Sequence, residues 1–331
     1  MNTSVRRISA LAIAMIAATA LAACSTPSTP TTPTASKPGA VTDIAVSSSP
    51  SSGNASLYLP IQDGSYKAAG LNVTPQVLQN GAQAVPLLLN GQLQFAASDP
   101  LSALAAISQG TPISIVAAGA IVPTDASKDP NGAIVAADST ITSLKGLNGK
   151  TVAVNGLNGF AAVSMKAAID AAGGDSSSIK WVEIPIPQMQ TSVANHTVDA
   201  AVTTEPFITA AEAAGSGVKP LPGGGIATAT GGLPQLVYLA SDDYIAQHKD
   251  TVSAFVSAVN AAAKKLTGDP SLIRTVAKTS TTVSADVLDK MTLPAFGPLT
   301  LKAMTKLQSL AVKYHVLSGP VADLPKHVFT N

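Results

Sequence analysis

The stretch LQFAASDPLSALAAISQGTPISIVAA, residues 93–118, decides the fold of this chain. Residues 93–97 predict a short strand, and the almost continuous apolar run 113–118 predicts another. Between them, residues 100–109 predict a helix whose first turn Asp99 can cap. A strand that is apolar on both faces is typical of a parallel sheet covered by helices on both sides.

The same alternation of β-branched runs, helical stretches and Gly or Pro punctuation extends along the chain. We predict strands over residues 40–47, 72–78, 93–97, 113–118, 133–137, 151–155, 180–184, 200–203 and 235–240. We predict helices over residues 56–69, 83–89, 100–109, 143–147, 160–172, 187–194, 205–214, 251–266, 284–291 and 301–314. Alternation on this scale predicts an α/β fold with mostly parallel sheets flanked by helices.

The N-terminus, residues 1–23, has the pattern of a cleavable export signal. Arg6 and Arg7 precede an uncharged apolar run that is shorter than the roughly 20 residues of a spanning helix. Small residues lead into Cys24, the only cysteine, whose thiol can carry a lipid; residues 24–39 follow as a Ser/Thr/Pro tether. We therefore predict an extracytoplasmic protein that lipidated Cys24 anchors to the membrane. An incidental thiol is the alternative, and general and twin-arginine export both stay open.

Composition excludes several classes of function. The net charge is +1 and only 12% of the residues are charged, so the basic surface that nucleic-acid binding requires is missing. The four histidines follow no metal-ligand spacing, and the sequence has no nucleophile elbow and no phosphate-binding loop. We predict a protein that is not an enzyme and that needs no metal and no cofactor.

Four segments in a fixed order resemble a known group of binding proteins. They are LYLPIQDGSYKAAGLNV (57–73), GAQAVPLLLNGQLQFAASD (81–99), AADSTITSLKGLNGKTVAV (136–154) and DAAVTTEPF (199–207). They look like segments of the NMT1/SsuA-like substrate-binding proteins of ABC transporters, which have the type II periplasmic-binding-protein fold. That group serves importers of nitrate, sulfonate, taurine and thiamine precursors.

The resemblance implies two α/β lobes that close on a small solute and then present it to a permease and its ATPase. Lobe 1 would hold residues 40–134 and 238–331, and lobe 2 would hold residues 135–237. We expect a monomer. A lipid-anchored sensor or docking module of the same fold, without transport, stays an alternative. A thiamine-pyrimidine synthase-like enzyme is a further one.

Ligands of open α/β sheets bind beyond the carboxyl ends of the strands, where helix N-termini offer N–H groups. That rule and the resemblance select nine ligand-binding candidates: Ser49, Asn54, Ser98, Asp99, Gly119, Asn158, Gly159, Phe160 and Glu205. Of these, Asn158 is expected to cap a helix or bind ligand, and Phe160 to stack on the ligand. Each candidate also has a structural alternative. Asp99 suits a plain helix cap, residues 155–160 a glycine turn, and Glu205 a first-turn acid.

The chemistry of the ligand follows from the charges of the body. Arg274 is the only arginine after the signal, whereas Asp99 and Glu205 are both expected to face the ligand. This balance favours a solute with an amine or an amino-pyrimidine, although helix N-termini and hydroxyl groups leave nitrate or sulfonate open. We expect Glu205→Ala to weaken binding and to leave the melting temperature almost unchanged. A large loss of stability would instead make Glu205 structural.

Overall fold

The computed structural model describes residues 41–49, 51–78, 83–212, 215–281 and 283–329. The chain divides into one unit of residues 1–38 and another of residues 39–331, and the fold below is that of the second unit. The predicted signal peptide, Cys24 and the tether lie outside the described residues. Within the described ranges, no helix combines the length and the apolar character that a bilayer span requires.

The first of two five-stranded sheets is built around β1 (Thr42–Ser48). This strand pairs in parallel with β2 (Leu71–Val77) and with β3 (Phe95–Ser98). β11 (Val237–Ser241) runs antiparallel between β3 and β4 (Ile113–Ala118). All six residues of β4 are buried, which explains why its sequence is almost continuously apolar.

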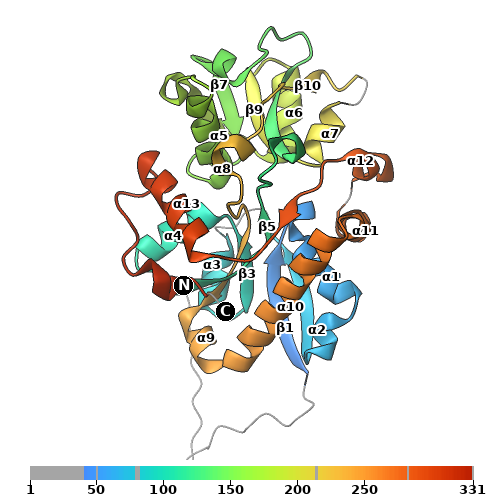
Figure 1. Cartoon of the computed structure of the whole chain (residues 1–331), viewed down its shortest axis with the longest axis vertical. Helices are drawn as coiled ribbons and strands as arrows, with labels where there is room; N and C mark the ends of the chain where they lie inside the picture. Colours follow the sequence, from blue (N-terminus) through green and yellow to red (C-terminus); the bar gives the residue numbers. More distant parts are fainter. Residues whose placement is uncertain (1–40, 50, 79–82, 213–214, 282, 330–331) are drawn as a thin grey trace, which may run out of the picture. The chain divides into compact units, whose positions relative to one another are not determined.

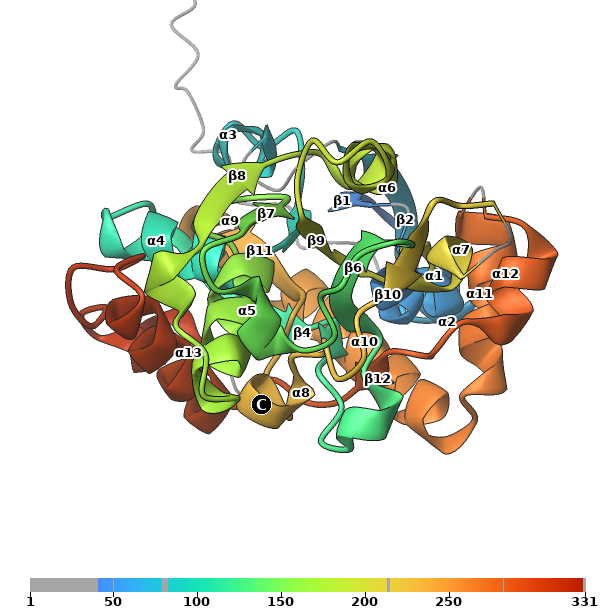
Figure 2. The ribbon, with the colours of Figure 1, turned by 90° about the horizontal axis from the view of Figure 1, so that it is seen from above.

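The second sheet repeats this plan with five other strands. β7 (Thr151–Val154) pairs in parallel with β8 (Lys180–Glu183) and with β9 (Ala200–Thr204). β6 (Asn131–Ala136) runs antiparallel between β9 and β10 (Val218–Pro220). Figure 2 shows β8, β7, β9, β6 and β10 side by side in this order.

In each sheet four strands run one way and a single strand runs against them. This arrangement confirms the predicted α/β class, and each sheet is mixed, with two parallel and two antiparallel pairings. The opposing strand of the first sheet, β11, follows all five strands of the second sheet in the sequence. The first sheet therefore combines four strands that precede the second sheet in the chain with one that follows it. The residue boundaries of the two lobes stay a prediction.

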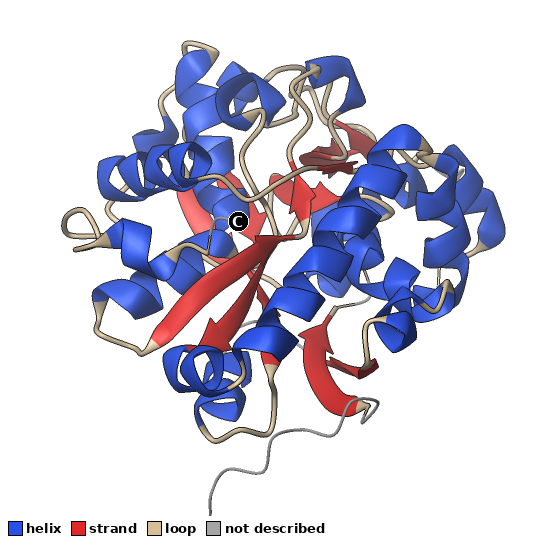
Figure 3. Ribbon diagram, turned by 60° about the horizontal axis from the view of Figure 1, so that its bottom comes forward, coloured by secondary structure: helices blue, strands red, loops and turns tan. Residues whose placement is uncertain are grey.

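Helices surround the strands of both sheets (Figures 1 and 3). The helices next to the strands of the first sheet in sequence are α1 (Ala55–Gln62), α2 (Ser65–Ala68), α3 (Ala84–Leu89), α4 (Pro100–Ser108), α9 (Asp242–Gln247) and α10 (Lys249–Gly268). Those next to the strands of the second sheet are α5 (Phe160–Ala171), α6 (Ile186–Ala194), α7 (Phe207–Ala211) and α8 (Ala227–Thr230). The C-terminal part adds α11 (Ser271–Ser280), α12 (Ala285–Lys290) and α13 (Leu301–Lys313).

Helix α10 shows how the sequence pattern makes the core. Val252, Phe255, Val256 and Val259 recur at i, i+3, i+4 and i+7, and all four are buried. The ring of Phe255 stacks on Phe95 of β3 with 3.8 Å between the ring centroids. Burial of one such large apolar side chain contributes about 1.5–3 kcal/mol, so this face holds the helix on the sheet.

Several elements differ from the prediction, since α8, α9 and β10 are absent from it, and two further differences have a local cause. The helix predicted over residues 56–69 is split into α1 and α2, because Gly64 takes a left-handed φ of 77° between them. Helix α11 is absent from the predicted elements although its sequence carries the signal. Its buried residues Ile273, Val276 and Ala277 have the spacing of one helix face.

Candidate ligand-binding site

The nine candidate residues all lie at or beyond the end of a strand. Ser49 and Asn54 follow β1, Ser98 ends β3 and Asp99 follows it, Gly119 follows β4, Asn158, Gly159 and Phe160 follow β7, and Glu205 follows β9. Hydrogen bonds join Asp99 to Phe160 and Ser49 to Asn54, two pairs that are not neighbours in the sequence. Ser98 is buried, and its hydroxyl donates to the carbonyl of Asp99 at 3.2 Å.

The carboxylate of Asp99 joins the N-termini of two helices that belong to different sheets. Its Oδ1 accepts from the backbone N–H groups of Leu101 at 2.8 Å and Ser102 at 3.1 Å, in the first turn of α4. Its Oδ2 accepts from the N–H of Phe160, the first residue of α5, at 2.6 Å. Burial raises the pKa of Asp99, although the three N–H donors act to lower it. Asp99 is therefore both the predicted helix cap and a bridge between the two sheets.

The loop before α5 presents backbone rather than side chains to Asp99. A Cβ on Gly159 would lie 3.3 Å from Asp99 Oδ2, so glycine leaves room for the carboxylate. The ring of Phe160 is only 5% exposed and packs in the hydrophobic core, so in this conformation the residue offers its N–H and not a stacking surface. Asn158 is exposed and makes no side-chain cap to α5 in the described structure.

Asn54 carries a buried acceptor without a partner. Its Nδ2 donates to the carbonyl oxygen of Ser49 at 2.9 Å and to Ser49 Oγ at 3.0 Å. Because a carbonyl oxygen can only accept, these bonds define which atom of the amide is nitrogen. The side chain is 0% exposed, and its Oδ1 finds no donor among the described residues. The loop after β1 thus holds one acceptor that a ligand donor could satisfy.

Gly119 lies where the chain leaves the first sheet. Its N–H donates to the carbonyl of Leu236 at 2.8 Å, and a Cβ at this position would lie 2.6 Å from Leu236 Cδ2. A larger residue here would displace the side chain of Leu236, so glycine allows the two connecting segments to pack closely. The backbone next to it continues into β5 (Ala120–Ile121), which pairs with β12 (Ala295–Phe296). The described contacts of Gly119 are thus structural, and its ligand role stays a prediction.

Glu205 is 3% exposed, and both of its carboxylate oxygens have partners. Oε2 accepts from the N–H of Thr209 at 3.0 Å, while Oε1 accepts from the Thr209 hydroxyl at 2.9 Å and the N–H of Thr292 at 3.1 Å. Burial raises the pKa of Glu205 against the lowering effect of these bonds. In this conformation the carboxylate ties α7 to the segment before β12, and its predicted role as a ligand contact is untested.

Polar contacts that none of the nine candidate residues makes hold together the segments that enter and leave the second sheet. Asp129 Oδ2 accepts from the N–H groups of Ile226 and Ala227, each at 2.6 Å. Asn131 Nδ2 donates to Gln235 Oε1 at 2.9 Å and so links the outgoing and returning segments. The sequence signal was the turn-forming run Asp-Pro-Asn-Gly that begins at Asp129.

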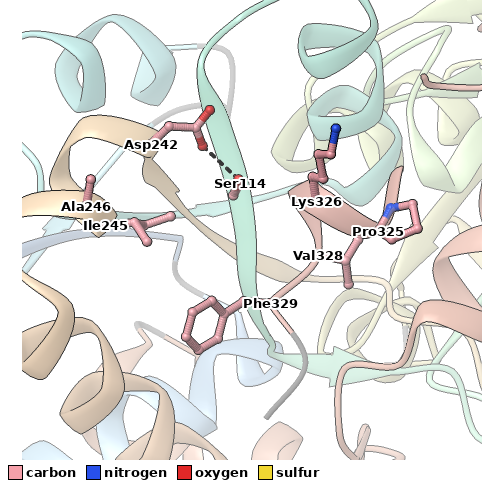
Figure 4. Close-up of a pocket in the computed structure, with 8 residues that line it drawn as sticks. All are labelled: Ser114, Asp242, Ile245, Ala246, Pro325, Lys326, Val328 and Phe329. Atoms are coloured by element: carbon pink, nitrogen blue, oxygen red, sulfur yellow. Dashed lines mark hydrogen bonds between the residues drawn. The ribbon is translucent and has the colours of Figure 1, made fainter. Parts of the chain in front are cut away.

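Two surface hollows in the described structure lie apart from these loops. One, of about 520 Å³, lies beside β4, and there the hydroxyl of Ser114 donates to Asp242 Oδ1 at 2.7 Å (Figure 4). The other, of about 660 Å³, lies at the end of α13 beside His315. None of the nine candidate residues lines either hollow. Within the described ranges, no cluster of three or more His, Cys, Asp or Glu side chains could hold a metal ion.

Comparison with known proteins supports the resemblance of the four segments. The sequence matches the NMT1/THI5-like family over residues 52–272. No match is found among curated proteins.

Solved structures share the fold at low sequence identity. The alkanesulfonate-binding protein SsuA of Xanthomonas axonopodis pv. citri, bound to MOPS, is 18% identical with a TM-score of 0.69; the match covers 89% of this chain and 99% of that one. The ligand-binding component of an ABC-type import system from Staphylococcus aureus, with zinc bound, is 16% identical with a TM-score of 0.72, covering 87% and 99%. SsuA of Escherichia coli is 17% identical with a TM-score of 0.69, covering 88% and 98%. The predicted NMT1/SsuA-like resemblance is confirmed.

Proposed function

Because the chain belongs to the NMT1/THI5-like family, we propose that it is the substrate-binding protein of an ABC importer. It captures a small polar solute between the loops at the carboxyl ends of its two sheets and delivers the solute to a permease and its ATPase. The proposal takes in solutes like nitrate, sulfonate or taurine and solutes like the thiamine pyrimidine. We further propose that the protein acts as a monomer and is not an enzyme.

The hydrogen bond between Asp99 and Phe160 carries this proposal. It joins the loop after β3 of the first sheet to the loop after β7 of the second, and the two residues are 61 positions apart. Both loops lead into helices, so their N–H groups point to the same place. A solute that enters there contacts both sheets at once, and such contacts favour the closed over the open arrangement.

The membrane side of the proposal rests on the N-terminal sequence. Lipidated Cys24 would anchor the protein outside the cytoplasm, and the Ser/Thr/Pro tether would give the body reach toward the permease. A protein held near its permease meets it at a raised effective concentration, so a soluble form is not needed for delivery.

Mass spectrometry of solute that co-purifies with the full chain in detergent tests the proposal, followed by calorimetric titration of the solute found. We expect one small polar solute in a one-to-one ratio and heat of binding when it is added back. Absence of any bound solute, or consumption of pyridoxal phosphate by the purified chain, would contradict it. If the protein bound the solute but cells that carry the protein and its permease did not take the solute up, the lipid-anchored sensor without transport would be favoured.

A further inference from the structure

The C-terminal part of the chain adds a third segment to the two connections between the sheets. This strap (residues 285–297) consists of α12, β12 and the residues that join and follow them. Its strand β12 pairs with β5 of the outgoing connection, where Ala295 lies opposite Ile121. Ile121 also forms an antiparallel bridge to Pro234 of the returning connection. The strap and the two connections are therefore paired with one another between the sheets.

The strap is fixed to helices of the first sheet and of the C-terminal part. Leu288, Met291 and Phe296 are buried in one hydrophobic cluster with residues of α1, α10 and α11. Arg274 of α11 donates to the carbonyl oxygens of Asp289 at 3.2 Å and of Met291 at 2.9 Å. The only arginine of the body thus holds the end of α12 in place, since it satisfies carbonyl groups at a helix C-terminus.

The strap also holds the second sheet, through a buried hydrogen bond. Thr292 donates its backbone N–H to Glu205 Oε1 at 3.1 Å. Glu205 is 3% exposed and also accepts from Thr209 of α7. Separation of this strap joint would leave buried donors and a buried carboxylate without partners, which is costly.

Helix α5 is held by contacts of a different kind. Its first N–H, that of Phe160, donates to Asp99 Oδ2 at 2.6 Å. Near its other end, Asp170 Oδ2 accepts from the hydroxyl of Tyr314 at 2.8 Å and lies 4.0 Å from Lys313 Nζ. Asp99, Asp170 and Tyr314 are all partly exposed. Water can replace the partners in such contacts, so they separate at little cost.

The two kinds of contact lie on different sides of the strap. Figures 1 and 2 show α5 and α13 on one side of β12, and α7 and α12 on the other. We propose that the two sheets move apart on the α5 side, and that the strap joint between Glu205 and Thr292 is the pivot of this motion. Helix α5 then leaves Asp99 and Tyr314 together, while α7 stays on the strap.

This inference concerns the motion of the protein and goes beyond the proposed function. It makes the two ends of α5 depend on each other. Phe160 and Asp170 are about 15 Å apart along the helix, because an α-helix rises 1.5 Å per residue. A change at Tyr314 reaches the N–H of Phe160 only if the whole helix moves, whereas local fraying would leave that distant N–H unaffected.

Hydrogen exchange of the full chain in detergent, before any solute is added, tests the pivot. Mass spectrometry with electron-transfer fragmentation reads single amides, each relative to its intrinsic rate. In the wild type we expect the N–H of Phe160 to exchange at least tenfold faster than that of Thr292. Tyr314→Phe should speed exchange at Phe160 at least threefold and leave Thr292 unchanged.

Tyr58→Phe is the matched control, because it removes a hydroxyl that bonds Ser48 at 2.9 Å in the region of the first sheet. This variant should match the wild type at Phe160 and at Thr292. Melting temperature and circular dichroism establish that both variants are folded.

The inference is overturned if Phe160 and Thr292 exchange equally fast in the wild type, or if Tyr314→Phe leaves Phe160 unchanged. Equal acceleration at both amides would also overturn it, because the two sheets would then separate as a whole. None of these outcomes bears on the proposed function, which the co-purified solute tests.

Discussion

Two acid–proline turns have equivalent places in the two sheets. Asp99-Pro100 follows β3 and opens α4, while Glu205-Pro206 follows β9 and precedes α7. Each is the middle strand of its sheet: β3 lies between β1 and the opposing strand β11, and β9 lies between β7 and the opposing strand β6. Each carboxylate accepts from a backbone N–H far along the chain, Asp99 from Phe160 and Glu205 from Thr292.

The two turns differ in how far their acidic residues are exposed to solvent. Glu205 is buried, and three donors from Thr209 and Thr292 converge on its two oxygens. Asp99 also accepts from three N–H groups, of which only that of Phe160 belongs to the other sheet, but its residue is partly exposed to solvent. The comparison therefore predicts that the Glu205 turn, which is shielded from solvent, is the more firmly held of the two joints.

Glu205→Ala should give the largest effect on stability. It leaves the N–H groups of Thr209 and Thr292 without their acceptor in a buried place, so we expect a loss of about 2–4 kcal/mol in the free energy of unfolding. This replaces the expectation from sequence of an almost unchanged melting temperature. Urea denaturation measures it, with exposed Glu212→Ala in the same turn region as control. A loss below about 1 kcal/mol would show that Glu205 is not a joint.

Asp99→Ala should cost less, about 1–2 kcal/mol, because it removes the cap of α4 and one bond to α5 at a partly exposed place. Thermal unfolding followed by circular dichroism measures the change, with Asp175→Ala as the control for loss of a cap alone. If Asp99→Ala destabilised the protein as much as Glu205→Ala, the proposed difference between the two turns would be lost.

The comparison of the two turns can be extended to a third contact that joins segments far apart in the sequence. Tyr314, at the end of α13, donates its hydroxyl to Asp170 Oδ2 of α5 at 2.8 Å. Tyr314→Phe should cost about 0.5–1.5 kcal/mol, since it removes one partly exposed hydrogen bond. Tyr58→Phe is the matched control, because its hydroxyl bonds Ser48 inside the first sheet region at 2.9 Å. The drop in denaturant midpoint should be smaller for Tyr314→Phe than for either acid variant.

The smallest effect expected is on the pH dependence of stability. Burial raises the pKa of Glu205 in the folded protein, so the folded state holds this proton to a higher pH than the unfolded state. Its contribution is then fully present below the unfolded pKa and is lost as the pH rises through the folded pKa. The stability of the wild type relative to Glu205→Gln should therefore fall as the pH rises from acid toward neutral. A rise over that range would contradict the raised pKa.

Much of the fold could be predicted because its signals are local. The apolar run of β4 and the one-sided pattern of α10 follow from burial on two faces and on one face. The cap of α4 by Asp99 needs only the next three residues, and the structure places it there. The family resemblance then supplied the pairing of segments that periodicity alone does not contain.

The sequence by itself determined the strand–helix alternation, the class of fold and the loops at the ends of the strands, since each depends on neighbouring residues. Only the tertiary structure decided what those loops touch. The partner of Asp99 lies 61 positions away, that of Glu205 lies 87 away, and the burial of the Phe160 ring depends on core residues from both sheets. Contacts at such separations arise from packing of whole layers, which no short window of residues encodes.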